Sequence, residues 1–151
     1  MPPNIIYRHA TEQDVPAITA FVDYWLTGGG LPDKTPGAVH DAFVPPGRHL
    51  KFVTKYNTIL ALHESFIVGW AVTTNKHVLI HLLVAGNYRH RGIGSQLLKS
   101  LAPETIRSKT DQSSGDPAQF YLDHDFEPAG IPLQGKRKNI QIFSKMDRPE
   151  I

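Results

Sequence analysis

The stretch that decides the fold is Leu82-Leu83-Val84-Ala85-Gly86-Asn87-Tyr88-Arg89-His90-Arg91-Gly92-Ile93-Gly94, in which an apolar strand leads through a glycine-containing loop into a helix. Arg89, Gly92 and Gly94 form an R-x-x-G-x-G pattern where that helix begins. Glycine lets the backbone approach a ligand closely, and a helix N-terminus offers unpaired N–H groups with partial positive charge. The stretch therefore predicts an anion site suited to a pyrophosphate, with Arg89 and Arg91 adding charge.

Other interpretations of this loop stay open or are excluded. Gly92 and Gly94 alone could simply permit a tight turn before an ordinary helix. A nucleotide-binding P-loop needs G-x-x-x-x-G-K-[ST], which the chain lacks. The dinucleotide fingerprint needs a third glycine where Leu97 stands, and a βαβ unit that this pattern does not predict.

Around this stretch the hydrophobic periodicity alternates between that of strands and that of helices. We expect strands at residues 5–10, 52–56, 58–63, 66–73, 77–84, 105–109 and 140–145. We expect helices behind the N-cap residue Thr11, near residues 38–43, and at 92–101 and 116–123. Pro45-Pro46-Gly47 is expected to stop the second helix, and Glu64-Ser65 to form a turn. This order predicts a mixed α+β layer rather than alternating βαβ units.

Composition and charge limit the class of protein. The chain has 151 residues, of which 40% are apolar and 20% charged, so we expect one globular domain over 1–151 and no disordered, collagen-like or coiled-coil chain. No apolar run is long enough to cross a bilayer, and no secretory signal is visible, so we expect a cytoplasmic protein without membrane partners. The absence of cysteine excludes disulfides, thiolate metal sites and an acyl-cysteine intermediate.

The charge is unevenly distributed between the two halves of the chain. Residues 1–75 carry 5 Lys and Arg against 6 Asp and Glu, a net charge of −1, whereas residues 76–151 carry 11 against 8, a net of +3. A mildly positive second half fits a phosphate-bearing ligand but is too weak to indicate nucleic-acid binding by itself.

With its loop, the chain resembles the GNAT N-acetyltransferase superfamily, whose acyl-CoA loop reads [RQ]-x-x-G-x-[GA] after a long strand. Two further stretches match in the expected order: Arg8-His9-Ala10-Thr11 followed by Asp14, and Ala118-Gln119-Phe120-Tyr121 followed by Phe126. The resemblance covers roughly residues 5–145. It implies a central twisted mixed sheet of about six or seven strands flanked by about four helices.

The resemblance also implies acetyl-CoA as co-substrate and names the residues that would bind it. The backbone amides of residues 89–94 would hold the pyrophosphate, and the Val84 amide would face the thioester carbonyl. The implied cofactor-binding set is Leu82, Val84, Arg89, His90, Arg91, Gly92, Ile93 and Gly94. Acetyl transfer would go directly to a primary amine, without a covalent acyl-enzyme.

Two side chains are candidates for the proton transfers of such a reaction. Tyr121 matches the family's usual general acid near the CoA sulfur; the alternative is a tyrosine that only packs on its helix. His81, two residues before Leu83 on the strand, has an ordinary pKa of about 6.5 that suits a general base; the alternative is a hydrogen-bonded strand histidine. His77 shares the face of His81 at a spacing of four, but without a third ligand we expect no metal. His124 is expected at a solvated helix end.

Two positions depart from the family pattern. Ser114 stands where many members have an asparagine that contacts CoA, and Asp125 stands where a glycine usually precedes Phe126. The polar stretch 108–116 is either a solvated loop or supplies the missing contact, with Ser114 and Asp116 as the candidates. Asp116 is also a natural N-cap ahead of Pro117.

For the acceptor, the resemblance points to Tyr24, Trp25 and the loop at 28–30, and to Lys136 and Arg137. The basic residues could attract an acidic substrate or a nucleic-acid backbone; the alternative is a solvated hairpin tip. The acceptor is expected to be a small molecule or a macromolecule with an amine, and the protein a monomer or homodimer. A GNAT-fold enzyme acting on a DNA or RNA base, and a non-catalytic acyl-CoA-binding module, remain as alternatives.

Overall fold

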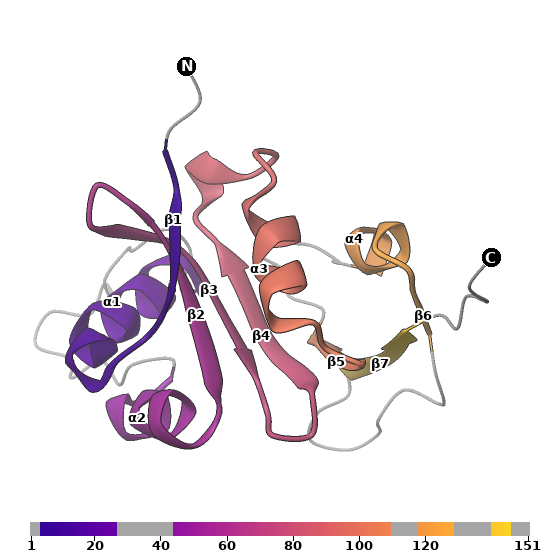
Figure 1. Ribbon diagram of the computed structural model, residues 1–151, viewed down its shortest axis with the longest axis horizontal. Helices are drawn as coiled ribbons and strands as arrows, with labels where there is room; N and C mark the ends of the chain where they lie inside the picture. Colours follow the sequence, from indigo (N-terminus) through magenta and orange to yellow (C-terminus); the bar gives the residue numbers. More distant parts are fainter. Residues whose placement is uncertain (1–3, 27–43, 110–117, 129–139, 146–151) are drawn as a thin grey trace, which may run out of the picture.

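The computed structural model describes residues 4–26, 44–109, 118–128 and 140–145. Seven strands form one sheet in the order β1-β2-β3-β4-β5-β7-β6, in which only the β4–β5 pair is parallel (Figure 1). The strands are β1 (Ile6–His9), β2 (Asn57–His63), β3 (Phe66–Thr73), β4 (Val78–Val84), β5 (Thr105–Lys109), β6 (Phe126–Pro128) and β7 (Ile140–Lys145). The helices are α1 (Val15–Leu26), α2 (Pro46–Lys55), α3 (Ile93–Leu101) and α4 (Ala118–Asp123), with 3₁₀ turns η1 (Glu12–Asp14) and η2 (Gly86–Tyr88). The expected mixed α+β class is confirmed.

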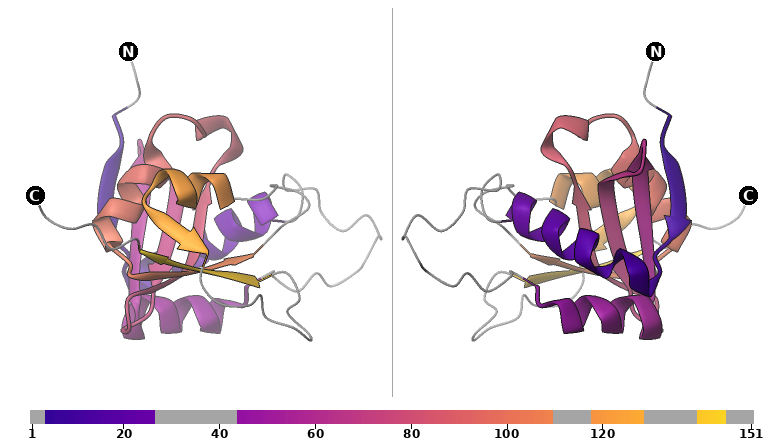
Figure 2. Two further views of the ribbon diagram at one scale, coloured as in Figure 1. Left: turned by 90° about the vertical axis from the view of Figure 1, so that its right-hand side faces the viewer. Right: turned by 90° about the vertical axis from the view of Figure 1, so that its left-hand side faces the viewer.

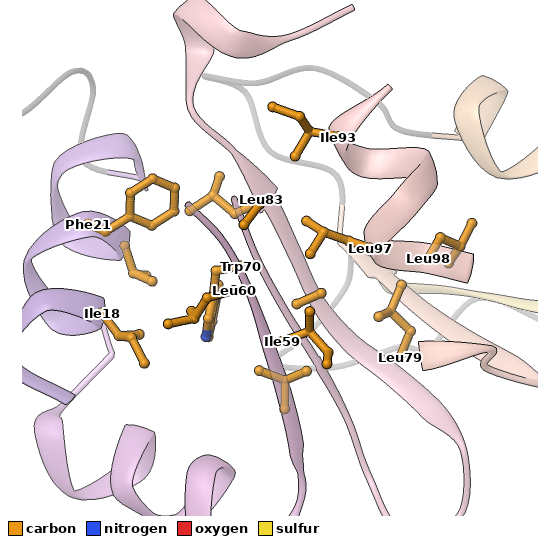
Figure 3. Close-up of a cluster of buried hydrophobic side chains, with 14 of the residues drawn as sticks. Ile18, Phe21, Ile59, Leu60, Trp70, Leu79, Leu83, Ile93, Leu97 and Leu98 are labelled. Carbon is orange, nitrogen blue, oxygen red and sulfur yellow. The ribbon is translucent and has the colours of Figure 1, made fainter. Parts of the chain in front are cut away.

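Helices cover both faces of this sheet (Figure 2). Ile18 and Phe21 of α1 lie on one face, with Leu60, Trp70 and Leu83 of the sheet, whereas α3 lies on the other (Figure 3). On the α3 face the backbones approach closely at Gly69 of β3. A Cβ there would lie 2.9 Å from a Leu97 methyl and 3.0 Å from an Ile93 methyl, so any larger residue would force these side chains of α3 to shift.

The expected strand at 52–56 is wrong, because Pro46–Lys55 form helix α2. Pro46 is the first helical residue, where its fixed φ suits a helix and its missing N–H costs nothing, so helix α2 begins within the Pro-Pro-Gly sequence. His49 and Phe52, three residues apart, form its buried face. The helix expected at 38–43 lies outside the described residues. The short strand β6 was not predicted, because three residues ending in a proline show no periodicity.

The remaining expected strands and turn agree with the structure to within a residue or two. Glu64 and Ser65 have φ values of 52° and 77°, as the two central residues of a tight hairpin turn require. At the N-terminus, Arg8 binds both carboxylate oxygens of Asp14, at 2.7 and 2.8 Å, while the Thr11 N–H donates to the same carboxylate. These bonds lower the pKa of Asp14 to about 2 and join β1 to the start of α1.

Strand β4 contains a bulge that changes which face its side chains occupy. His81 pairs with Val72 and Leu79 with Thr73 on β3, so Ile80 is the extra residue. Leu79 therefore lies toward α3, whereas Leu83 lies toward α1 (Figure 3). Without this bulge, residues 79, 81 and 83 would all share one face.

The sheet is weakly joined between β4 and β5. Only two residue pairs connect these strands, Val78 with Thr105 and Leu79 with Ile106, whereas five pairs connect β5 with β7. Within the described residues the pairing of β4 with β5 thus stops at Leu79. The second half of β4 has one edge that β5 does not cover.

Candidate active site

The loop between β4 and α3 has the backbone conformation that an exposed helix end requires. Gly92 is the N-cap of α3 with φ 80° and ψ 5°, and no side chain caps the helix there. The first backbone bond of the helix runs from the Gln96 N–H to the Gly92 carbonyl, at 3.0 Å. The N–H groups of Ile93, Gly94 and Ser95 therefore precede the intrahelical bonds and carry the positive end of the helix dipole.

Among the described residues, the space at Gly92 is open. A Cβ placed there would meet none of their atoms within 4 Å, and Arg89, His90 and Arg91 are all exposed. His90 also has a positive φ, of 64°, which the sequence pattern did not indicate. The arrangement can accept an anion at the backbone amides, and the exposed residues Arg89 and Arg91 add positive charge to the same loop.

The loop is fixed to the rest of the protein by Tyr88. The Tyr88 hydroxyl forms a 2.5 Å hydrogen bond with Nδ1 of His63 at the end of β2. The Arg91 guanidinium lies over the Tyr88 ring, 5.1 Å from its centre, which is within the range of a cation–π contact. Tyr88 thereby contacts both His63, at the end of β2, and Arg91 of the loop. No sequence motif predicted these contacts.

The uncovered edge of β4 presents backbone N–H groups beside the same loop. The Ala85 N–H donates to the Val68 carbonyl of β3, at 2.9 Å. Because N–H groups alternate in direction along a strand, those of Val84 and Leu82 point away from β3, toward the edge that β5 leaves open. No strand of the described sheet pairs with these two donors, so they can bind a carbonyl or an extended chain that enters between β4 and β5.

Helix α4, which carries Tyr121, packs next to this loop. Its neighbour Phe120 would be only 3.3 Å from a Cβ on Gly94, and Val84 would be 3.7 Å from the same position. The end of β4, the first turn of α3 and α4 therefore meet at Gly94. The Tyr121 ring is 5% exposed and lies 5.4 Å from the Phe143 ring. Burial raises the pKa of Tyr121 well above its ordinary value of 10, so the phenol stays protonated at neutral pH.

His81 lies on the opposite face of the sheet, toward α2. Its half-buried ring stacks on Trp70, with centroids 4.8 Å apart, and lies 5.3 Å from Phe52. The expected shared face of His77 and His81 is wrong. His77 is an exposed turn residue before β4, and the bulge at Ile80 lies between the two histidines. No group of three metal-ligating side chains occurs in the described segments.

His124 is not the solvated helix end that its acidic neighbours suggested. Its ring is partly buried, with Nε2 2.7 Å from the Ser95 hydroxyl oxygen and Nδ1 2.7 Å from the Phe120 carbonyl oxygen. Asp125, where the family pattern has glycine, has a φ of 70°. Aspartate is among the few residues that adopt this conformation at modest cost, so the departure leaves the local backbone intact.

The other candidate residues are only partly placed. Trp25 of α1 packs against Gly86 at the start of the loop, where an added Cβ would lie 3.0 Å from its ring. Tyr24 is exposed and lies edge-on to Trp25, 4.8 Å away. The remaining candidates lie outside the described residues: Ser114, Asp116, Lys136, Arg137 and the loop at 28–30. Each helix in the described segments is too short or too polar to span a bilayer.

Comparisons with known proteins agree with this geometry. The model of the GNAT acetyltransferase domain matches residues 54–128. The fold is similar to that of a GNAT-family acetyltransferase from Streptococcus pneumoniae, at a TM-score of 0.63 and 16% identity over 95% of this chain and 100% of that one. It is similar to the PaiA N-acetyltransferase of Thermoplasma acidophilum in complex with coenzyme A, at a TM-score of 0.61 and 16% identity over 95% of this chain and 99% of that one. It is also similar to the ribosomal-protein-S18-alanine N-acetyltransferase of Escherichia coli, at a TM-score of 0.63 and 13% identity over 97% of both chains. At such identities the likeness establishes the fold, and no curated protein sequence matches the chain.

Proposed function

Because the chain belongs to the GNAT acetyltransferase superfamily, we propose that it transfers an acetyl group from acetyl-CoA directly to a primary amine. The observation that carries this proposal is the convergence at Gly94. There the open helix end and the end of β4 meet helix α4, on which the buried, protonated Tyr121 directly follows the contact residue Phe120. The thioester of acetyl-CoA supplies the activated acetyl group.

The residues of the loop fit a CoA pyrophosphate. The amides of Ile93, Gly94 and Ser95 would bind the phosphate oxygens, and the side chains of Arg89 and Arg91 would offset their charge. The open space at Gly92 leaves room for the phosphates against the backbone. His90 would contribute its backbone to the same loop. The donors on the open edge of β4, Leu82 and Val84, would bind the extended arm and the thioester carbonyl.

Proton transfer would use groups on the two faces of the sheet. His81 would take a proton from the attacking ammonium, directly or through water, while the amine nitrogen bonds to the carbonyl carbon. The C–S bond then breaks, and the Tyr121 hydroxyl would protonate the departing thiolate. Burial raises the pKa of the phenol, but the same dry surroundings raise the pKa of the thiol above its ordinary 8.5, so the transfer is less uphill than the phenol alone suggests.

The acceptor would approach from the α1 and α2 face, where His81 lies. Trp25 and Tyr24 border the start of the loop on that face and would contact the acceptor. Ser114, Asp116, Lys136 and Arg137 stay candidates from the sequence. The similar Escherichia coli enzyme is a protein-alanine N-acetyltransferase by description, which supports a peptide or protein amine as one class to test.

A thiol-release assay tests the proposal directly. The chain has no cysteine, so a thiol reagent reports only the CoA that the reaction frees. The acceptor panel should hold small amines, peptides with free N-termini, peptides with lysine, and DNA and RNA oligonucleotides. We expect thiol release with at least one amine. Tight CoA binding without release from any acceptor would instead indicate a non-catalytic acyl-CoA-binding module, and absence of CoA binding would overturn the proposal altogether.

A further inference from the structure

The first turn of α3 and the end of α4 are joined by a hydrogen-bonded pair 29 residues apart in the chain, Ser95 and His124. Ser95 is the third helical residue of α3, next to the amides that would hold the pyrophosphate. His124 directly follows α4, three residues after Tyr121. The His124 N–H donates to the Tyr121 carbonyl, at 3.0 Å, so the pair lies next to the backbone of the candidate acid.

The hydrogen bonds determine which ring nitrogen of His124 carries the proton. The Phe120 carbonyl only accepts, so His124 Nδ1–H must be the donor in that 2.7 Å bond. In the neutral ring Nε2 then has a free lone pair and accepts the Ser95 O–H, also at 2.7 Å. Both bonds are short and mutually consistent, so the ring is held in one orientation.

A six-residue helix does not hold its own position. Helices as short as α4 are unstable in isolation, so their placement comes from tertiary contacts. For α4 these contacts include Phe120 on Gly94, Tyr121 on Phe143, and His124 on Ser95. The last of these is directional, since a hydrogen bond fixes angle as well as distance.

We propose that His124 is a positioning residue for the acyl transfer, which through Ser95 fixes the helix of Tyr121 against the first turn of α3. This inference rests on the proposed function. It assigns the Ser95 hydroxyl to His124 and not to the ligand. Removal of the pair should therefore lower turnover while leaving CoA affinity unchanged, because the amides and Gly92 are untouched.

The experiment compares Ser95→Ala, His124→Phe and the double variant with the wild-type protein. Phenylalanine keeps a ring against Phe120, whose centroid lies 4.3 Å from that of His124, but lacks both nitrogens. Ser95→Thr keeps the hydroxyl, and Ser100→Ala removes an exposed serine from the same helix as the matched control. The readouts are kcat and KM for acetyl-CoA, and the CoA dissociation constant from calorimetry.

We expect kcat to fall about tenfold in Ser95→Ala, which loses the shared hydrogen bond, and at least as much in His124→Phe, which also loses the bond to the Phe120 carbonyl. The double variant should fall no further than His124→Phe, because the shared bond is already lost. The CoA dissociation constant should stay within about twofold. Ser95→Thr should recover turnover relative to Ser95→Ala, and Ser100→Ala should retain full turnover. Unchanged kcat in Ser95→Ala and His124→Phe would overturn the inference. So would effects that multiply in the double variant, or a CoA affinity that falls in step with kcat.

A second readout is independent of turnover. Nitrogen-15 NMR of the imidazole rings should show His124 as the Nδ1–H tautomer in the wild-type protein, with an Nε2 shift that changes in Ser95→Ala. This signature without acetyl transfer to any amine would overturn the proposed function, and the catalytic role of the pair with it. Acetyl transfer by a protein without the signature would overturn the pair alone.

Discussion

Replacement of Gly92 by alanine tests the geometry on which the site depends. Gly92 has φ 80° and ψ 5°, and a Cβ there would meet nothing within 4 Å. The protein itself therefore leaves room for the methyl group, and the cost comes from the backbone conformation. Left-handed backbone costs an L-residue roughly 1–2 kcal/mol relative to glycine. Alanine also has fewer unfolded conformations to lose, which offsets about 0.4–1 kcal/mol of that cost.

We expect Gly92→Ala to lower the free energy of unfolding by about 1 kcal/mol. In Gly92→Ala the loop can relax to a negative φ at residue 92. If bound CoA requires the left-handed conformation, binding must restore that conformation and bear its free-energy cost. That requirement weakens CoA binding by roughly 5- to 30-fold, since 1.4 kcal/mol is a factor of ten. A valine adds bulk against the phosphates and should abolish measurable binding.

Gly47→Ala is the matched control, because an added Cβ at Gly47 also meets nothing within 4 Å but the backbone is helical. There we expect a gain in stability of up to about 1 kcal/mol and unchanged CoA binding. Urea unfolding gives the stabilities, and titration calorimetry with CoA gives the affinities. Equal CoA affinity in Gly92→Ala and Gly47→Ala would refute the assignment of this loop as the phosphate site.

Three further predictions concern other elements. Tyr121→Phe should lower kcat by about 10²–10⁴-fold with CoA affinity retained, and an unchanged rate under conditions where chemistry is limiting would remove Tyr121 from the role of acid. Ala102 is the C-cap of α3 with φ 47°, so Ala102→Gly should raise the free energy of unfolding, measured with urea, by about 0.5–1 kcal/mol. A lower free energy of unfolding would contradict the argument that alanine is strained there. Burial lowers the pKa of His49 to about 4, so the folded state stays neutral while the unfolded chain takes up a proton below about pH 6.5. The free energy of unfolding should therefore fall as the pH drops from about 6.5 to 4, and His49 should contribute at most about 1.4 kcal/mol per pH unit to this slope. His49→Phe should remove that contribution, and identical slopes in the two proteins would contradict the argument.

Much of the fold could be predicted because the decisive signals are local. Hydrophobic alternation identifies β3 and β5 with their observed bounds, and Glu64-Ser65 indicates the hairpin between β2 and β3. The segment at 52–56 was misassigned because Phe52 and Tyr56 also fit a strand pattern. Its helical conformation follows from Pro46 and from burial of His49, which only the tertiary structure reveals.

The site divides in the same way. The R-x-x-G-x-G pattern predicts the start of α3, and the structure adds that Gly92 has a positive φ there. The sequence does not show the bulge at Ile80, because an extra residue in a ladder depends on the partner strand. The role of His124 was missed for a related reason: its partner Ser95 is remote in the chain, and neither residue carries a motif.

The seam at Val78 and Leu79 has a consequence for how the protein responds to ligands. Two residue pairs are all that join strands β1 to β4 with strands β5, β6 and β7 in the described sheet. An extended ligand bound between β4 and β5 beyond these pairs would form backbone hydrogen bonds that the two strands do not make with each other. It would thereby stabilise the position of one half of the sheet relative to the other. Amide protons of β4 and β5 should then exchange with solvent more slowly in the liganded protein. We expect the protection to increase together on both strands, including at residues that do not contact the phosphates of the ligand.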